Sequence, residues 1–109
     1  MKSILIIEDN KSLREDIYES LKYEDFEVFQ TDNGKSGIKY ALSHHPDLIL
    51  CDIMMPEMNG FEVLEKLRQN ERASLIPFIL ITSLADRNNF RTGMEMGADD
   101  YITKPFTLK

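Results

Sequence analysis

Several side chains that could do chemistry stand at or just beyond the ends of apolar runs in this 109-residue sequence: Glu8, Asp9, Asp52, Thr82 and Lys104. An acid placed directly after an apolar run needs partners elsewhere in the chain, because a buried carboxylate is costly unless something pairs with it. Asp52 raises this question most sharply, since it follows the run LILC and precedes a loop that contains a proline.

The types of these residues point to phosphoryl transfer. Three carboxylates that gather at one place repel one another unless a cation lies between them. The group offers only oxygen ligands and no His or Cys, which favours a hard cation such as Mg²⁺. In phosphoryl transfer a carboxylate can be the nucleophile, a metal and a lysine neutralise phosphoryl oxygens, and a hydroxyl donates a hydrogen bond. An ionised aspartate needs no general base for this role.

Each of these residues alone also has a purely structural interpretation. Asp9 or Asp52 could be a turn or capping acid. Thr82 is a common strand residue, and Lys104 could be a solvated surface charge. The functional interpretation rests on their conjunction, because chance rarely places acids, a hydroxyl and a lysine at the ends of four apolar runs.

The elements that must hold these residues alternate between strand and helix. Apolar runs predict strands at residues 4–7, 48–51 and 78–81, with shorter strand-prone segments around residues 28–29 and 101–103. Helix-spaced apolar residues lie between them: Leu13, Ile17 and Leu21; Ile38, Ala41 and Leu42; Phe61, Leu64 and Leu67; and Phe90 with Met94. Five strands and four helices in alternation predict a doubly wound parallel sheet, whose ligand site lies at the carboxyl ends of its strands.

Local signals agree with these boundaries. Asn10 can cap the first helix, Pro46 ends the second, and Gly97 occupies a place where a helix C-terminus favours a left-handed residue. Gly93 within the fourth helix costs about 1 kcal/mol relative to alanine. It either softens that helix or packs closely against a neighbour, and the sequence leaves both open.

Composition and length limit the class of protein. Residues 1–109 make one domain, and the net charge of -6 disfavours nucleic acid and anionic membranes as direct ligands. A cation or a cationic partner suits this charge better. The N-terminal apolar run is too short for a signal peptide, and we expect no membrane association. The single Cys51 fits a reducing cytoplasm, which is the expected location.

Two residue types near the candidate site or at a helix end are assigned structural roles. Cys51 is expected to be a small buried apolar residue that faces away from Asp52. His44 and His45 stand at the predicted end of a helix, where they suit the helix dipole, and no neighbouring cysteine or paired carboxylate suggests a metal site there.

Four longer motifs carry a resemblance that covers essentially the whole chain. They are IIEDN at residues 6–10, LILCDIMMPEMNG at 48–60, PFILITS at 77–83 and GADDYITKPF at 97–106. With these motifs and their spacing, the chain resembles the receiver domain of two-component response regulators. The resemblance implies an α/β fold in which a doubly wound five-stranded parallel sheet, in the flavodoxin-like order 2-1-3-4-5, has helices on both faces.

The resemblance also implies roles for individual residues. Asp52 would be phosphorylated by a sensor histidine kinase or phosphotransfer protein, and the resulting switch in conformation would control an output. Mg²⁺ would be the cofactor, held by Glu8, Asp9, Asp52 and the backbone carbonyl of Met54. Lys104 would contact the phosphoryl group. The domain would catalyse its own phosphorylation and dephosphorylation without being a turnover enzyme.

Further positions match the conformational switch of that family. Thr82 resembles the hydroxyl that moves toward the phosphoryl group, and Tyr101 resembles the aromatic residue that follows this movement. Residues 83–96 would form the element that changes state. The bond between Lys104 and Pro105 would be cis, as is typical of the family.

The chain departs from the family pattern after the KPF motif, where receiver domains continue into a fifth helix. Only Thr107, Leu108 and Lys109 follow here. We therefore expect a receiver domain truncated before its last helix, with any output domain or partner protein beyond this chain. Homodimerisation stays possible under this interpretation, although the family's usual dimer surface includes the absent helix.

Two alternatives from other classes stay open. A Mg²⁺-dependent phosphohydrolase with an aspartate nucleophile would use similar chemistry, but it usually carries a second acid where this chain has Met54. A pseudo-receiver binding module that is never phosphorylated would not need the complete set of acids together with Thr82 and Lys104.

Overall fold

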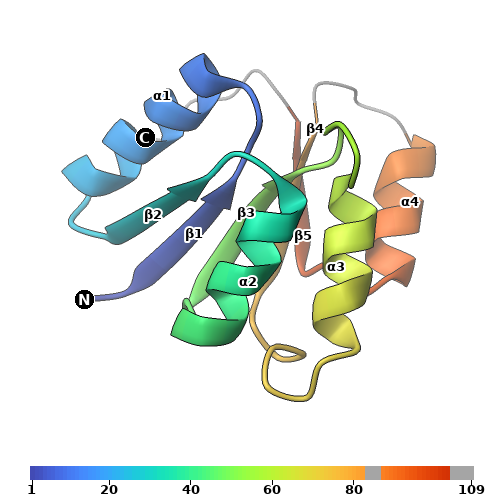
Figure 1. Cartoon of the computed structure of the whole chain (residues 1–109). Helices are drawn as coiled ribbons and strands as arrows, with labels where there is room; N and C mark the ends of the chain where they lie inside the picture. Colours follow the sequence, from blue (N-terminus) through green and yellow to red (C-terminus); the bar gives the residue numbers. More distant parts are fainter. Residues whose placement is uncertain (83–86, 104–109) are drawn as a thin grey trace.

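The computed structural model describes residues 1–82 and 87–103, apart from the side chains of residues 82, 87–90 and 103. Strands and helices alternate along this part of the chain, as predicted (Figure 1). In order they are β1 (Ser3–Ile7), α1 (Lys11–Tyr23), β2 (Glu27–Thr31), α2 (Gly34–His44), β3 (Leu48–Asp52), α3 (Gly60–Arg68), β4 (Phe78–Thr82), α4 (Arg87–Glu95) and β5 (Asp100–Thr103).

The strands form one parallel sheet in the order β2-β1-β3-β4-β5, which confirms the predicted topology. Ile7 at the end of β1 is level with Cys51 in β3, and Asp52 is level with Ile81 in β4. The strand pairing therefore extends one residue further than the apolar runs suggested. Asp52 is the last residue of its strand rather than the first residue beyond it.

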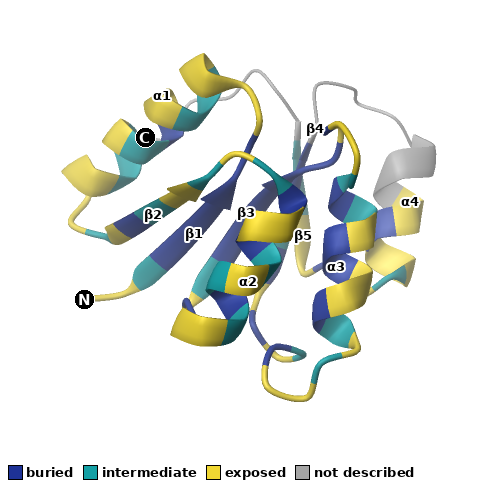
Figure 2. Ribbon diagram, in the orientation of Figure 1, coloured by how far each residue is buried: buried dark blue, intermediate teal, exposed yellow. Residues whose placement is uncertain are grey.

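The sheet is covered on both faces, and this is why its central strands are apolar throughout. Helix α1 lies on one face, and α2, α3 and α4 lie on the other (Figure 1). Isoleucines of β1 alternate between two core clusters: Ile4 and Ile6 pack with Ile17 of α1, while Ile7 packs with Val63 of α3. Figure 2 shows β1 and β3 buried along almost their whole length. A strand buried on both faces requires this continuous apolar pattern.

Asparagines begin the first three helices. The side chain of Asn10 accepts a hydrogen bond from the backbone of Leu13, as predicted, and Asn33 caps α2 in the same way. Asn59 and Glu62 form a reciprocal capping box at the start of α3. Helix α2 ends at His44, just before Pro46, with His45 in the left-handed conformation at a φ of 48°. No helix among the described residues is long and apolar enough to cross a membrane.

Arg68, the last residue of α3, contacts the segment between α4 and β5. Its guanidinium donates to the carbonyls of Ile76 at 2.9 Å and Gly97 at 2.8 Å, and it forms an ion pair with Asp99 at 3.2 Å. The same Asp99 carboxylate accepts a hydrogen bond from the backbone of Phe78 at 2.7 Å. Gly97 itself has a φ of 98°, in agreement with the predicted left-handed residue. This network positions the start of β5 beside β4.

Gly93 packs closely against the sheet, which decides between the two interpretations left open by the sequence. A Cβ atom at this position would lie 2.5 Å from Cδ1 of Leu80, a side chain with no exposed surface. Because Leu80 is enclosed, it has little room to move aside. Gly93 is therefore required by the contact between α4 and β4.

We expect Gly93→Ala to destabilise the domain by about 1 kcal/mol, because overpacking against Leu80 outweighs the better helix propensity of alanine. Urea denaturation measures this change. The neighbouring Met94→Ala, at a side chain that is 41% exposed, is the matched control and should change stability by less than about 0.5 kcal/mol. A stabilised Gly93→Ala variant would contradict the packing argument.

Candidate functional site

The sheet brings Glu8, Asp9 and Asp52 together at the carboxyl ends of its central strands. Because Ile7 and Cys51 are level in the parallel pairing of β1 and β3, the residues that follow them, Glu8 and Asp52, leave the sheet side by side. Each of the three acids offers a carboxylate oxygen, and these oxygens lie within 4.8 Å of one another. The predicted acidic cluster is therefore present.

The three acids differ in their exposure to water. Glu8 has no exposed surface and Asp52 is 3% exposed, whereas Asp9 lies on the surface. Removing charged carboxylates from water is unfavourable, and crowding them adds repulsion. A cation bound at this place would relieve both costs, and it could enter from the side of Asp9. The all-oxygen donor set suits a hard divalent cation.

Three hydrogen bonds hold Glu8, two through its backbone and one through its carboxylate. Its N–H donates to the carbonyl of Thr31 at 3.1 Å, and its carbonyl accepts from the guanidinium of Arg14 at 2.9 Å. One carboxylate oxygen of Glu8 accepts from the backbone N–H of Asn10 at 3.1 Å. Arg14 and Thr31 were not predicted as parts of the site. No local pattern marks them, since each acts through a contact that only the folded chain creates.

The loop that carries Asp52 into α3 depends on Gly60. The N–H of Ile53 donates to the carbonyl of Ile81 at 2.9 Å, and the carbonyl of Ile53 accepts from the N–H of Gly60, also at 2.9 Å. A Cβ atom on Gly60 would collide with the carbonyl oxygen of Asp52 and would lie 2.9 Å from Cα of Ile53. The start of α3 can therefore approach the end of β3 only because residue 60 has no side chain.

The side chain of Met54 points to solvent beside this acidic cluster. It is 63% exposed, whereas Met55 next to it is buried. Within the same loop Glu57 has a φ of 67°, a conformation that non-glycine residues adopt rarely. No acid stands at the position two residues after Asp52, where a hydrolase of the aspartate-nucleophile type would carry one.

Cys51 has the structural role that the sequence suggested. It has no exposed surface, and its thiol donates a weak hydrogen bond to the carbonyl of Asp52 at 3.4 Å. Burial, followed by the negative charges of Asp52 and Glu8, raises the pKa of the Cys51 thiol well above its usual range. A neutral buried thiol is a poor nucleophile.

The remaining predicted site residues are described only in part. Thr82 ends β4, but its side chain is outside the described residues, as are Lys104 and Pro105. The segment predicted to change state, residues 83–96, is described from residue 87 onward. Tyr101 lies in β5, level with Leu80, and is half-buried against the core cluster of the α2–α3 face. The next residue of β5, Ile102, is level with Ile81, which is in turn level with Asp52.

A family model described as the response regulator receiver domain matches residues 4–109. Response regulator ArlR of Staphylococcus saprophyticus is 41% identical over 109 residues, which are 100% of this chain and 48% of that protein. Histidine kinase P4 of Formosa agariphila is 42% identical over 107 residues, which are 98% of this chain and 8% of that protein. The chain thus spans about half of the first relative and a small part of the second.

Solved structures agree with these sequence relatives. The chemotaxis protein CheY4 of Vibrio cholerae superposes with a TM-score of 0.93 at 26% identity, covering 98% of this chain and 89% of that one. The receiver domain of sensor histidine kinase PA1611 from Pseudomonas aeruginosa, which has a magnesium ion coordinated in its active-site cleft, gives a TM-score of 0.89 at 26% identity. That match covers 97% of this chain and 87% of the other.

We expect Gly60→Ala to destabilise the domain by about 1–3 kcal/mol, because the added methyl group must push α3 away from the backbone of Asp52. Urea denaturation measures the loss, and backbone amide NMR shifts should concentrate at residues 52–62. Ser36→Ala, at an exposed helix position, is the control and should change stability by less than about 0.5 kcal/mol. Equal stability of the two variants would refute the requirement for glycine at residue 60.

Proposed function

The chain belongs to the response regulator receiver domain family, and from this premise we propose that Asp52 accepts a phosphoryl group from a histidine kinase or a phosphotransfer protein. The observation that supports this proposal most directly is the cluster of Glu8, Asp9 and Asp52, whose oxygens lie within 4.8 Å of one another. Asp52 is the member that ends the central strand β3.

Mg²⁺ is the proposed cofactor of this reaction. Oxygens bound to one Mg²⁺ are separated by at most about 4.2 Å, so the acidic cluster needs only a small side-chain movement to share an ion. Glu8, Asp9 and Asp52 would hold it, together with the backbone carbonyl of Met54. Bound there, the ion would neutralise phosphoryl oxygens and reduce the repulsion between the donor and the acidic cluster.

Asp52 is the proposed nucleophile. Its carboxylate oxygen forms a bond to phosphorus while the phosphorus–nitrogen bond to the donor imidazole breaks, and the electron pair of that bond returns to the imidazole nitrogen. The ionised carboxylate needs no general base, so the domain contributes mainly position and charge. Lys104 is the proposed contact to the phosphoryl oxygens. Attack of water on the acyl phosphate then restores the carboxylate and releases inorganic phosphate. In this proposal the domain promotes both the phosphorylation and the dephosphorylation of Asp52.

The proposed output of phosphorylation is a change around β4, α4 and β5. A phosphoryl group adds negative charge and acceptor oxygens at Asp52. Thr82 at the end of β4 and Tyr101 in β5 are the proposed switch residues, and Asp52 is level with Ile81, the residue before Thr82. The packing of Gly93 against Leu80 and the contacts of Arg68 to Gly97 and Asp99 give α4 and β5 defined partners in one state. An output domain or partner protein would read the change.

The family to which the chain belongs is not a classical enzyme family. A phosphohydrolase with the same nucleophile would need a group that protonates the leaving oxygen, and the thioether of Met54 cannot do so. The -6 net charge supports a domain that does not itself bind nucleic acid or an anionic membrane. Homodimerisation and a cytoplasmic location remain parts of the proposal.

We expect acetyl phosphate with Mg²⁺ to add one phosphoryl group to the chain, and beryllofluoride with Mg²⁺ to shift amide NMR signals of β4, α4 and β5. Asp52→Asn should abolish both effects, because the amide is a poor nucleophile. Intact mass measures the first effect. Asp16→Asn, at an exposed position of α1, is the matched control and should behave as the parent. Modification that persists in Asp52→Asn would contradict the assignment of the acceptor.

Metal binding gives an independent test of the acidic cluster. Without Mg²⁺, Asp9→Asn and Asp52→Asn should raise the melting temperature, because each removes repulsion between carboxylates. Added Mg²⁺ should stabilise the parent more than either variant, and Asp9→Asn should weaken Mg²⁺ affinity about tenfold. Thermal unfolding across a Mg²⁺ titration measures both quantities. A parent chain that Mg²⁺ does not stabilise would count against a metal at this place.

A further inference from the structure

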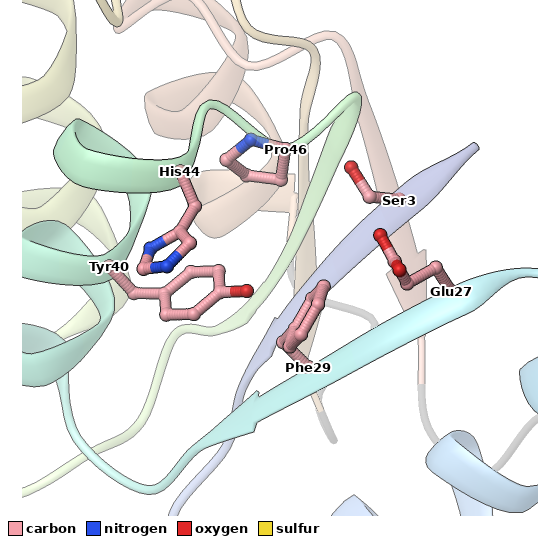
Figure 3. A pocket seen from close by; sticks show the side chains of 6 residues that line it. All are labelled: Ser3, Glu27, Phe29, Tyr40, His44 and Pro46. Atoms are coloured by element: carbon pink, nitrogen blue, oxygen red, sulfur yellow. The ribbon is translucent and has the colours of Figure 1, made fainter. Parts of the chain in front are cut away.

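A cavity lies near the amino-terminal ends of β1 and β2, whereas Asp52 lies at the carboxyl end of β3. It has a volume of about 90 Å³ and is lined by Ser3, Glu27, Phe29, Tyr40, His44 and Pro46 (Figure 3). Ser3 and Glu27 are the first residues of β1 and β2, whereas Asp52 is the last residue of β3. The cavity therefore takes no part in the acidic cluster at the carboxyl ends of the strands.

One wall of this cavity is aromatic. The rings of Tyr40 and His44, one turn apart on α2, stack with centroids 4.1 Å apart and an interplanar angle of 8°. The ring of Phe29 from β2 lies 5.0 Å from that of Tyr40 at an angle of 37°. Figure 3 shows the tyrosine hydroxyl directed toward the strands, on the side where Glu27 lies. Such π faces attract cations, which stack over them.

The polar atoms of the cavity are acceptors for a cation. The carboxylate of Glu27 extends from β2 beside Ser3 (Figure 3). The hydroxyl oxygen of Tyr40 is buried, and no group among the described residues forms a hydrogen bond with it. Burial, and then the charge of Glu27, raise the pKa of Tyr40 above its usual value. An orphaned buried hydroxyl is unfavourable unless a ligand or water reaches it.

The other polar groups at the rim already have partners. The hydroxyl of Ser3 donates to the Asp47 carboxylate at 3.3 Å and accepts from the Asp47 backbone at 3.2 Å. Nδ1 of His44 lies 2.9 Å from the hydroxyl of Ser43. Glu27 and Tyr40 therefore offer the acceptor oxygens through which this cavity can recognise a cationic ligand.

We propose that this cavity binds a guanidinium group. A guanidinium is planar, so it can stack on the ring of Phe29 or on the face of Tyr40 that His44 does not cover. Its N–H donors can reach the Glu27 carboxylate directly, and they can reach the Tyr40 hydroxyl after a small movement of that side chain, because this oxygen has almost no exposed surface. A compact ammonium satisfies the carboxylate but lacks the flat face. An anion is repelled by Glu27. The size of the cavity also fits. A single water molecule needs about 10–15 Å³ of cavity volume, and a volume of about 90 Å³ leaves room for the few heavy atoms of a guanidinium group.

The source of the guanidinium is either free arginine or an arginine side chain of a protein partner, and both share the chemistry that the cavity recognises. Titrations of the whole chain with L-arginine and with N-acetylargininamide, followed by amide and aromatic NMR shifts, separate them. Tighter binding of the blocked compound indicates a side chain within a polypeptide, and tighter binding of L-arginine indicates the free amino acid. Either result supports the site if the shifts saturate and centre on Phe29, Tyr40 and His44.

Variants at the two recognising groups sharpen the test. Glu27→Gln should weaken binding about fivefold through the loss of a charged acceptor. Tyr40→Phe should weaken it about threefold, and it should not lower the melting temperature, because the hydroxyl has no hydrogen-bond partner to lose within residues 1–82 and 87–103. Glu65→Gln removes one exposed negative charge from α3, outside the cavity, and is the matched control.

Three results would overturn the proposal. One is the absence of saturable shifts beyond those caused by potassium chloride at equal ionic strength, which would mean that the cavity holds water only. Another is binding of n-butylammonium as tight as that of N-acetylargininamide, which would remove the planar group from the argument. The last is equal weakening by Glu27→Gln and Glu65→Gln, which would reduce the effect to net charge. Because Asp52 and Mg²⁺ play no part, all three are independent of phosphorylation.

Discussion

Negative charge is concentrated at the carboxyl ends of β1 and β3, and the neighbouring segments of the fold are arranged around it. The parallel register of these strands makes Glu8 and Asp52 neighbours, and Asp9 completes a group whose oxygens lie within 4.8 Å. Two of the three carboxylates are removed from water. Such a group is unfavourable by itself, and the surrounding fold must hold it against its own repulsion.

Backbone contacts among the described residues help to hold this acidic group in place. The guanidinium of Arg14 acts on the carbonyl of Glu8, and Thr31 accepts from its amide. Gly60 allows α3 to begin directly against the end of β3, where the capping box of Asn59 fixes the direction of the helix. The carboxylate oxygens of Glu8, Asp9 and Asp52 still lie within 4.8 Å of one another, as the proposed binding of a cation requires.

The two edges of the sheet have separate chemistries, and this follows from the connectivity. All strands run in the same direction, so the residues that follow them gather at one edge and the residues that precede them gather at the other. The acidic cluster occupies the first edge. The aromatic cavity with Glu27 and Tyr40 occupies the second, so a ligand there can contact the domain without blocking Asp52.

The order of the strands and helices could be predicted from the sequence, because continuous apolar runs and helix-spaced apolar residues differ in period, and each element is recognised locally. The sequence also placed Glu8, Asp9 and Asp52 at strand ends, and the family motifs supplied the strand order. The exact end of β3 was one residue further than the apolar run, since strand pairing with Ile81 includes a charged residue that hydropathy excludes.

The contacts between distant segments could not be predicted from the sequence, because they depend on how the elements pack together. Whether Gly93 softened its helix or packed against a neighbour depended on Leu80, a residue of another element. The hydrogen bond from Arg14 to Glu8 and the contacts of Arg68 with Gly97 and Asp99 produce no pattern in the sequence, because a long arginine side chain can reach many different acceptors. The stacking of His44 on Tyr40 and the nearby Phe29 likewise required β2 and α2 to meet. Local patterns specify the elements, but the approach of one element to another selects which side chains act together.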